Sequence, residues 1–141
     1  MDIIIRAYKP SDYTSVALLY KDSSTHGWQY DDARDSETKL NTFAQKNPKK
    51  LLVAEVNGSL VGSVTIFEDG RTAWLYRFAV HKTYESIVSQ LLYKKACAIV
   101  KRFGHSQLLV YAPKDAGIFI ERYTQLGFTQ WNDFTAYWQD L

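Results

Sequence analysis

Residues 74–103 read WLYRFAVHKTYESIVSQLLYKKACAIVKRF, and this segment says more about the fold than any other. Its β-forming first part, with the residues just before it, predicts a strand over residues 72–80. Its second part carries apolar side chains at helical spacing, which predicts an amphipathic helix over residues 85–103. Gly104 follows where a left-handed helix cap belongs. A strand that leads into a helix N-terminus presents unpaired backbone N–H groups, and these suit a phosphate-bearing ligand.

Two turn signals before this segment predict an antiparallel meander. Asn57-Gly58 lies between apolar runs at residues 51–56 and 60–67. This dipeptide favours a type I′ hairpin, because such a turn needs positive φ at both central positions. Asp69-Gly70 marks the next turn, which leads into the strand at 72–80.

The segments outside this region complete a mixed α/β sheet. Residues 107–111 follow the long helix as a short β-forming run, which predicts parallel pairing through a right-handed crossover. Further strands are expected at 3–8, 128–131 and 134–138, and further helices at 12–20, at 117–126 and in the segment that ends at Asn47-Pro48. We therefore expect one domain over residues 1–141, with about seven strands and four helices on both faces of the sheet.

Composition excludes several classes of protein. A net charge of +2 gives no reason to expect nucleic-acid binding. No apolar run approaches the ~20 residues of a membrane span. Cys97 is the only cysteine, which fits a reducing compartment, so we expect a cytoplasmic protein. The three histidines are not spaced as metal ligands, so no metal site is expected.

Three local sequences carry a family resemblance, namely LVAEVNGSLVG at 52–62, FAVH at 78–81 and YTQLGF at 123–128. In this order and within this succession of elements, the chain resembles the GNAT superfamily of N-acetyltransferases over nearly its whole length. The resemblance implies a single GNAT-like acyltransferase domain that uses acetyl-CoA as its acyl donor. It also implies an amine of a small molecule or peptide as the acceptor.

The resemblance assigns candidate site residues. In that family the strands that correspond to 72–80 and 107–111 separate, and acyl-CoA lies between them. The backbone of Phe78, Ala79 and Val80 would then pair with the pantetheine arm, and the Val80 N–H would face the thioester carbonyl. Tyr123 matches the tyrosine that protonates the departing thiolate. Residues at the N-terminus of the 85–103 helix would hold the pyrophosphate, and here these are Lys82, Glu85, Ser86, Ile87 and Ser89.

The chain departs from the family pattern at the phosphate loop. Residues 82–90 contain no glycine, although glycines in such a loop let backbone N–H groups approach a phosphate closely. Glu85 also places a negative charge where a pyrophosphate would lie. These departures favour an alternative function, a catalytically inactive GNAT-like module for binding or regulation.

The acceptor side of the site is less well defined. Glu68, Asp69 and His81 are candidate general bases, but each is explained as simply by a turn or surface position. The aromatic segment at 22–34 either recognises a substrate or folds back on the domain. Trp74, Tyr76 and Phe78 should share one face of their strand, with Leu75, Arg77 and Ala79 on the other. A third alternative is an unrelated α/β interaction domain, in which an aromatic hairpin at 128–138 makes a homodimer or partner surface.

Overall fold

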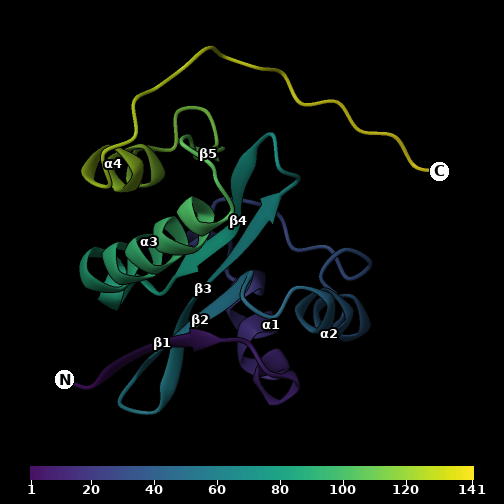
Figure 1. The fold of residues 1–141 in the computed structure, drawn as a ribbon, viewed down its shortest axis with the longest axis vertical. Helices are drawn as coiled ribbons and strands as arrows, with labels where there is room; N and C mark the ends of the chain where they lie inside the picture. Colours follow the sequence, from purple (N-terminus) through teal and green to yellow (C-terminus); the bar gives the residue numbers. More distant parts are fainter.

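The computed structural model describes all 141 residues, and a five-stranded sheet forms its centre (Figure 1). The strands lie in chain order from β1 to β5. The first four are antiparallel neighbours, whereas β5 runs parallel to β4, which confirms the predicted mixed sheet. The strand bounds are Ile3–Ala7 for β1, Leu51–Val56 for β2, Ser59–Glu68 for β3, Ala73–Val80 for β4 and Leu109–Val110 for β5.

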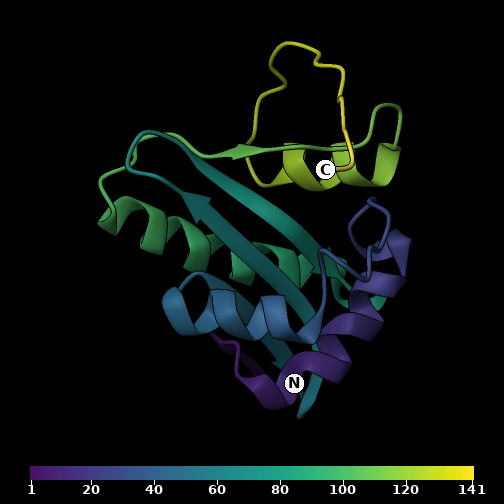
Figure 2. The same ribbon diagram turned by 90° about the vertical axis from the view of Figure 1, so that its right-hand side faces the viewer.

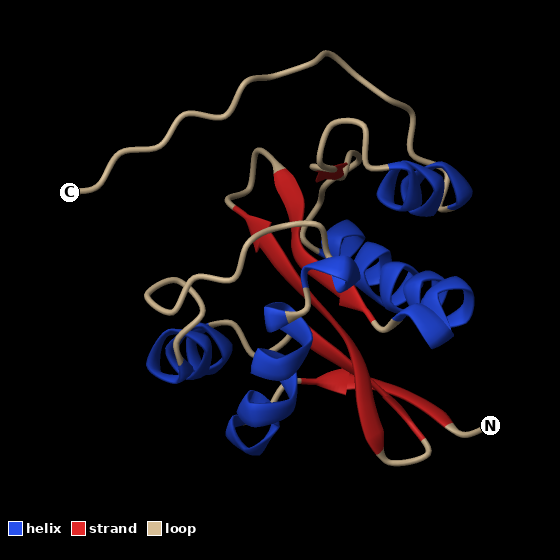
Figure 3. Cartoon of the chain, turned by 180° about the vertical axis from the view of Figure 1, so that it is seen from behind, coloured by secondary structure: helices blue, strands red, loops and turns tan.

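Four α-helices cover both faces of this sheet, as the sequence predicted. They are α1 (Tyr13–Lys21), α2 (Glu37–Lys46), α3 (Glu85–Arg102) and α4 (Gly117–Gln125). Helices α3 and α4 lie on one side of the sheet and α1 and α2 on the other (Figures 1 and 3). Each face has its own buried cluster, a larger one under α3 and α4 and a smaller one under α1. None of the helices is both long enough and apolar enough to cross a bilayer.

The predicted turns form for the expected reason. Asn57 and Gly58 have φ values of 50° and 81°, which is the backbone that a type I′ hairpin requires. Gly104 follows the cap residue Phe103 at the end of α3 with a φ of 87°, and its N–H donates to the carbonyl of Lys101. Local sequence therefore fixed both the meander and the end of the long helix.

The expectation of about seven strands was wrong, because the C-terminal hairpin does not form. Residues 129–141 contain no regular structure and all their side chains are exposed. Figure 2 shows this segment looping out beyond α4. The predicted strand at 107–111 is also shorter than expected, since only Leu109 and Val110 pair with β4. A two-residue edge offers too little backbone to dock a hairpin, and an isolated hairpin is marginal in water.

A bulge in β4 overturns the predicted division of its faces. Thr65 of β3 pairs with Tyr76, but Ser63 pairs with Ala79, so two residues of β4 face one of β3 between these pairs. Arg77 lies in the bulge with a φ of 48°. The extra residue reverses the alternation, so that Phe78 joins the α3 cluster with Leu75, while Ala79 joins the α1 cluster.

Pairing between β4 and β5 ends before this bulge. The two strands are in register only at Trp74 with Leu109 and at Leu75 with Val110. Beyond that point β5 leads into the loop that contains Pro113, whereas β4 continues to Val80. The edge of β4 from Phe78 to Val80 is therefore not paired with a strand.

Candidate active site

The unpaired edge of β4 points its backbone groups away from β3. The His81 N–H donates to the carbonyl of Val61 in β3 at 2.8 Å. Backbone groups of successive residues in a strand point to opposite sides, so the N–H and C=O of Val80 point to the β5 side. The carbonyl of Phe78 points the same way, because it accepts a hydrogen bond from Arg122 of α4. This edge can therefore offer main-chain donors and acceptors to an extended ligand.

Arg122 contacts this edge of β4 at the Phe78 carbonyl. Its Nη1 donates to the Phe78 carbonyl at 2.6 Å, and its Nη2 donates to the Thr25 carbonyl at 2.9 Å. The same guanidinium forms a two-point ion pair with Glu85, with Nη2 2.7 Å from Oε2. Only 1% of the Arg122 side chain is exposed. Arg122 thus joins α4, β4 and the first turn of α3 in one buried network.

Tyr123 lies next to Arg122 and faces the same gap. Its ring packs against Phe78 and Phe128, with centroid distances of 6.3 and 5.7 Å. Tyr123, Phe78 and Val110 are among the residues that line a narrow cavity of about 20 Å³ between β4 and β5. Burial raises the pKa of the Tyr123 hydroxyl above its usual value, so this group is a proton donor at neutral pH.

The first turn of α3 lies beside Arg122, to which Glu85 is paired. No side chain caps this turn, and Ser86, Ile87 and the preceding Lys82 are exposed. A 3-10 turn at Lys82–Tyr84 leads directly into α3, and the Glu85 N–H donates to the Lys82 carbonyl. The positive end of the helix dipole at this turn attracts anions. Ser89 is buried, and its hydroxyl turns back to the Ser86 carbonyl. The carboxylate of Glu85 is neutralised by Arg122 and does not stand alone at the helix end.

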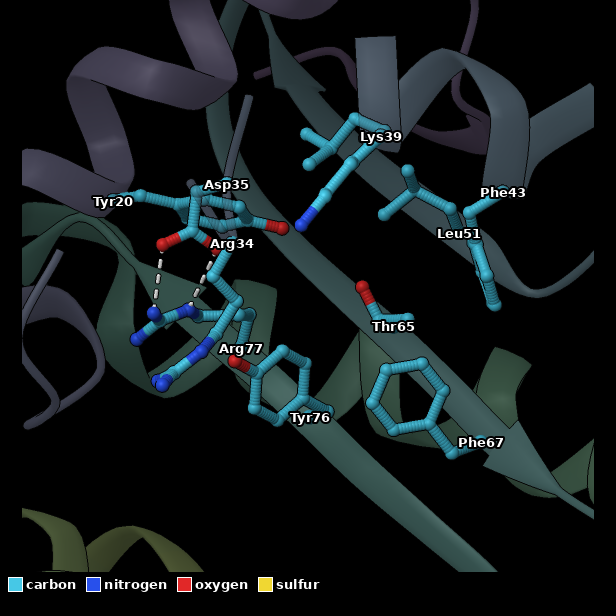
Figure 4. A pocket seen from close by; sticks show the side chains of 11 residues that line it. Tyr20, Arg34, Asp35, Lys39, Phe43, Leu51, Thr65, Phe67, Tyr76 and Arg77 are labelled. Atoms are coloured by element: carbon cyan, nitrogen blue, oxygen red, sulfur yellow. Dashed lines mark hydrogen bonds and ion pairs between the residues drawn. The ribbon is translucent and has the colours of Figure 1, made fainter. Parts of the chain in front are cut away.

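A larger pocket lies on the opposite face of β4 (Figure 4). Its volume is about 510 Å³, and it lies between α2 and the exposed faces of β3 and β4. Tyr76 and Arg77 line both this pocket and the narrow gap. The two cavities therefore lie on opposite sides of β4 and come closest at the bulge. Cavities of this size are typical of small-molecule sites.

The candidate bases lie away from both cavities. Glu68 pairs with Lys50 and His105, and Asp69 pairs with Arg71 in the turn before β4. His81 is exposed and uses Nδ1 to accept from the Thr83 N–H. None of the three lines either cavity.

The aromatic segment at 22–34 folds back on the domain. His26 is buried, its Nε2 lies 2.7 Å from the Tyr20 carbonyl, and its Nδ1 accepts from the Trp28 N–H. With both nitrogens engaged, His26 holds the segment in place. Trp28 remains 37% exposed and lines the narrow gap. No group of three or more His, Cys, Asp or Glu side chains converges anywhere in the chain.

Comparison with known sequences shows the family of the chain. The sequence model of the acetyltransferase (GNAT) family matches residues 13–128. The chain belongs to the GNAT family. A protein of Yersinia pestis (strain Pestoides F) named acetyltransferase is 30% identical over 126 residues, which cover 88% of this chain and 86% of that protein. An acetyltransferase of Yersinia enterocolitica is 29% identical over the same coverage.

Solved structures give the same GNAT fold. The PaiA N-acetyltransferase of Thermoplasma acidophilum, in complex with coenzyme A, has a TM-score of 0.79 at 20% identity, over 92% of this chain and 91% of that one. An aminoglycoside 6′-N-acetyltransferase of Acinetobacter baumannii has a TM-score of 0.75 at 15% identity, with 99% of each chain covered. Family membership overturns the alternative of an unrelated interaction domain.

The residues of this candidate site fit an acyl-CoA in their chemistry. The uncapped first turn of α3 can receive a phosphate even without a glycine loop, since Arg122 compensates the charge of Glu85. The free edge of β4 suits the amides of a pantetheine arm. The Phe78 carbonyl on this edge already has a partner, Arg122.

Sequence reasoning named Tyr123, Glu85 and the edge of β4, which the structure brings together, but it did not connect Glu85 with Arg122 or Arg77 with Asp35. Arg122 and Glu85 are 37 positions apart, and Arg77 and Asp35 are 42 positions apart. No local pattern connects residues at such separations. The only signal in the sequence was that Arg77 and Arg122 lie in otherwise apolar segments. An arginine that becomes buried with such a segment requires an acidic partner.

Proposed function

We propose that this chain is an acyl-CoA-dependent N-acyltransferase that transfers an acetyl group from acetyl-CoA to a primary amine of a small molecule or peptide. Membership in the GNAT family supports acyl transfer in general. The observation that carries the proposal is the free edge of β4, which lies between the buried Tyr123 hydroxyl and the uncapped N-terminus of α3.

Two sets of residues would hold the acyl donor. The backbone of Phe78, Ala79 and Val80 would bind the pantetheine arm, and the Val80 N–H would stabilise the oxyanion. The pyrophosphate would be bound at the start of α3 by backbone N–H groups and by Lys82, Glu85, Ser86, Ile87 and Ser89, where Glu85 acts through its ion pair with Arg122.

The proposed chemistry needs one proton donor on the protein. Acetyl-CoA supplies an activated carbonyl, at which a C–N bond to the amine forms while the C–S bond breaks. Tyr123 gives its hydroxyl proton to the departing thiolate and regains a proton from solvent. The proton lost by the amine goes to water, since no unpaired carboxylate or imidazole lines the larger pocket.

One observation favours the alternative of an inactive binding module. The gap beside β4 measures about 20 Å³, and Arg122 already occupies the Phe78 carbonyl. An acyl-CoA must displace this contact to pair with β4. If the displacement costs too much, the chain retains the fold without the chemistry.

Melting temperature with and without acetyl-CoA separates these possibilities. Ligand binding to the native state raises the melting temperature by mass action, and 100-fold excess over Kd adds ~2.7 kcal/mol of stability. We expect a clear rise at millimolar acetyl-CoA, together with amine-dependent thiol release. No rise would contradict the acyltransferase proposal, whereas a rise without thiol release on any amine would favour the binding module.

Replacement of Tyr123 tests its role as the acid. We expect Tyr123→Phe to lower kcat by roughly 10²-fold or more, with little change in KM for acetyl-CoA. Tyr93→Phe is the matched control, because Tyr93 also packs against Phe128 but lies on α3 outside both cavities. Equal rates for wild type and Tyr123→Phe would rule out the assignment.

A further inference from the structure

The larger pocket has one wall made of stacked aromatic rings. Phe67 packs edge-on against Phe43 with ring centroids 5.6 Å apart, and it stacks on Tyr76 at 5.0 Å with an interplanar angle of 28°. Leu40 and Leu51 extend this apolar lining toward α2. Phe67 is 42% exposed although it lies in the middle of this cluster. A continuous apolar wall of this kind gains free energy when an apolar or aromatic group covers it.

The charged groups of the pocket have a positive excess. Arg34 and Lys39 line it, are exposed and make no ion pair. Its only carboxylate, Asp35, accepts two hydrogen bonds from Arg77 and one from the Asp31 N–H. Asp35 is thereby neutralised inside the protein. The pocket can pair with an anion through Lys39 or Arg34 but offers no free anion to a cation.

The polar groups are arranged opposite the aromatic wall. Figure 4 shows the Lys39 ammonium and the Thr65 hydroxyl directed into the same space, with the Tyr76 and Phe67 rings on the other side. Tyr76 and Arg77, which also line the gap beside Tyr123, form the end of the pocket nearest that gap. An acceptor amine must approach this end if it is to reach an acyl group held along β4.

We infer that the pocket takes an amine that also carries a carboxylate and an apolar or aromatic side chain, with the free aromatic amino acids as the simplest members of this class. This inference rests on the proposed acyltransferase function. The carboxylate pairs with Lys39, the side chain covers the Phe43–Phe67–Tyr76 wall, and the amine faces the β4 end. Polyamines and aminoglycosides are disfavoured, because they bring several positive charges to a pocket that already has an excess of them.

These positive charges also affect the protonation of the acceptor amine, for which the pocket provides no general base. Nearby cations disfavour the ammonium form of an amine and lower its pKa. Arg34 and Lys39 therefore raise the fraction of acceptor that is neutral and nucleophilic when it binds, whereas the charge of Arg77 is balanced by Asp35. A positive pocket thus promotes the attack without a protein group that accepts the proton.

Three amines separate the contributions of the carboxylate and the aromatic ring. L-Phenylalanine has both, 2-phenylethylamine lacks the carboxylate, and spermidine is a polycation without a ring. Binding is measured by calorimetry with and without CoA, and kcat/KM is measured with acetyl-CoA. We expect L-phenylalanine to bind most tightly, 2-phenylethylamine about tenfold more weakly, and spermidine not measurably, since a charge-assisted hydrogen bond contributes about a factor of ten or more.

Lys39→Gln tests the carboxylate partner directly. It should weaken L-phenylalanine binding about tenfold and leave 2-phenylethylamine within twofold. Lys46→Gln is the matched control, since Lys46 is an exposed lysine of the same helix that does not line the pocket. This control should change neither amine.

The outcomes distinguish the inference from the function on which it rests. Spermidine binding or turnover equal to that of L-phenylalanine overturns the inference and leaves the transferase function intact. No binding of L-phenylalanine in any condition also overturns it. No acetyl-CoA binding overturns the proposed function, and calorimetry with the three amines then still decides the chemistry of the pocket.

Discussion

At the scale of single residues, Arg77 does the most to shape the site. It adopts a left-handed backbone that costs a non-glycine residue ~1–2 kcal/mol. Its guanidinium donates to both oxygens of Asp35 and to the Gln29 carbonyl, and the side chains of the ion pair are 1% and 2% exposed. This buried pair keeps the bulge in place and fastens the segment before α2 to β4. The shape of both cavities depends on it.

Replacing Arg77 should therefore be costly. Arg77→Gln leaves Asp35 buried without a compensating charge, and we expect the free energy of unfolding in urea to fall by about 3–5 kcal/mol. Arg71→Gln is the matched control, because its ion pair with Asp69 has side chains 86% and 43% exposed and should contribute less than about 1 kcal/mol. Equal losses for the two variants would contradict this role of the buried pair. The double variant Asp35→Leu/Arg77→Met buries no unpaired charge, so its free energy of unfolding should be higher than that of Arg77→Gln.

At the scale of elements, the carboxylate of Glu68 connects several segments at the end of β3. Glu68 at the end of β3 accepts from the Lys50 ammonium at 2.6 Å, from His105 Nε2 at 2.8 Å and from the Gly70 N–H at 3.0 Å. These contacts join β2, β3 and the loop after α3. The Lys50 hydrogen bond, followed by that of His105, lowers the pKa of Glu68 to about 2.

This lowered pKa predicts a loss of stability in acid. The pKa of Glu68 is lower in the folded than in the unfolded chain, so its contribution is complete at neutral pH and is lost as the pH falls from about 5 toward 2. Urea midpoints at pH 7, 5, 4 and 3 should fall for the wild type and fall less steeply for Glu68→Gln. Glu121→Gln, at an exposed glutamate outside any ion pair, should keep the wild-type slope. An unchanged slope in Glu68→Gln would exclude Glu68 as a source of the acid sensitivity.

At the scale of the whole molecule, the ordered fold ends near Phe128. The N–H of Phe128 donates to the Tyr123 carbonyl at 2.9 Å, and its ring packs against Tyr93 and Tyr123. The family match also ends at residue 128. Beyond it Trp131, Phe134, Tyr137 and Trp138 are all more than 60% exposed. A homodimer formed through these aromatic side chains stays a prediction, as does a cytoplasmic location.

Two truncations test where the fold ends. A chain that ends at Gln130 should keep the free energy of unfolding within about 0.5 kcal/mol, because the removed residues bury nothing. A chain that ends at Gly127 loses the Phe128 ring and the hydrogen bond that closes α4, and should lose about 1–3 kcal/mol. Equal stability of both chains would contradict the role of Phe128. A full chain with the mass of a dimer and a Gln130 chain with the mass of a monomer, both measured by light scattering, would indicate that the tail joins two copies.

Sequence alone determined the features that depend on neighbouring residues. The Asn57-Gly58 turn, the long amphipathic helix and its Gly104 cap follow from local backbone preferences and from hydrophobic spacing. Together these elements indicated the mixed sheet and the resemblance that led to Tyr123. The C-terminal hairpin failed because a strand pattern is not enough when no partner edge is available.

Only the tertiary structure decided the chemistry around these elements. The bulge at Arg77 has no glycine or other local signature, because a buried ion pair to Asp35 holds it in place. The Arg122–Glu85 pair and the positive pocket at Lys39 likewise join side chains from separate elements. Contacts between residues far apart in the chain depend on how the elements pack. Sequence spacing therefore predicted the framework of this protein, and packing placed its charges.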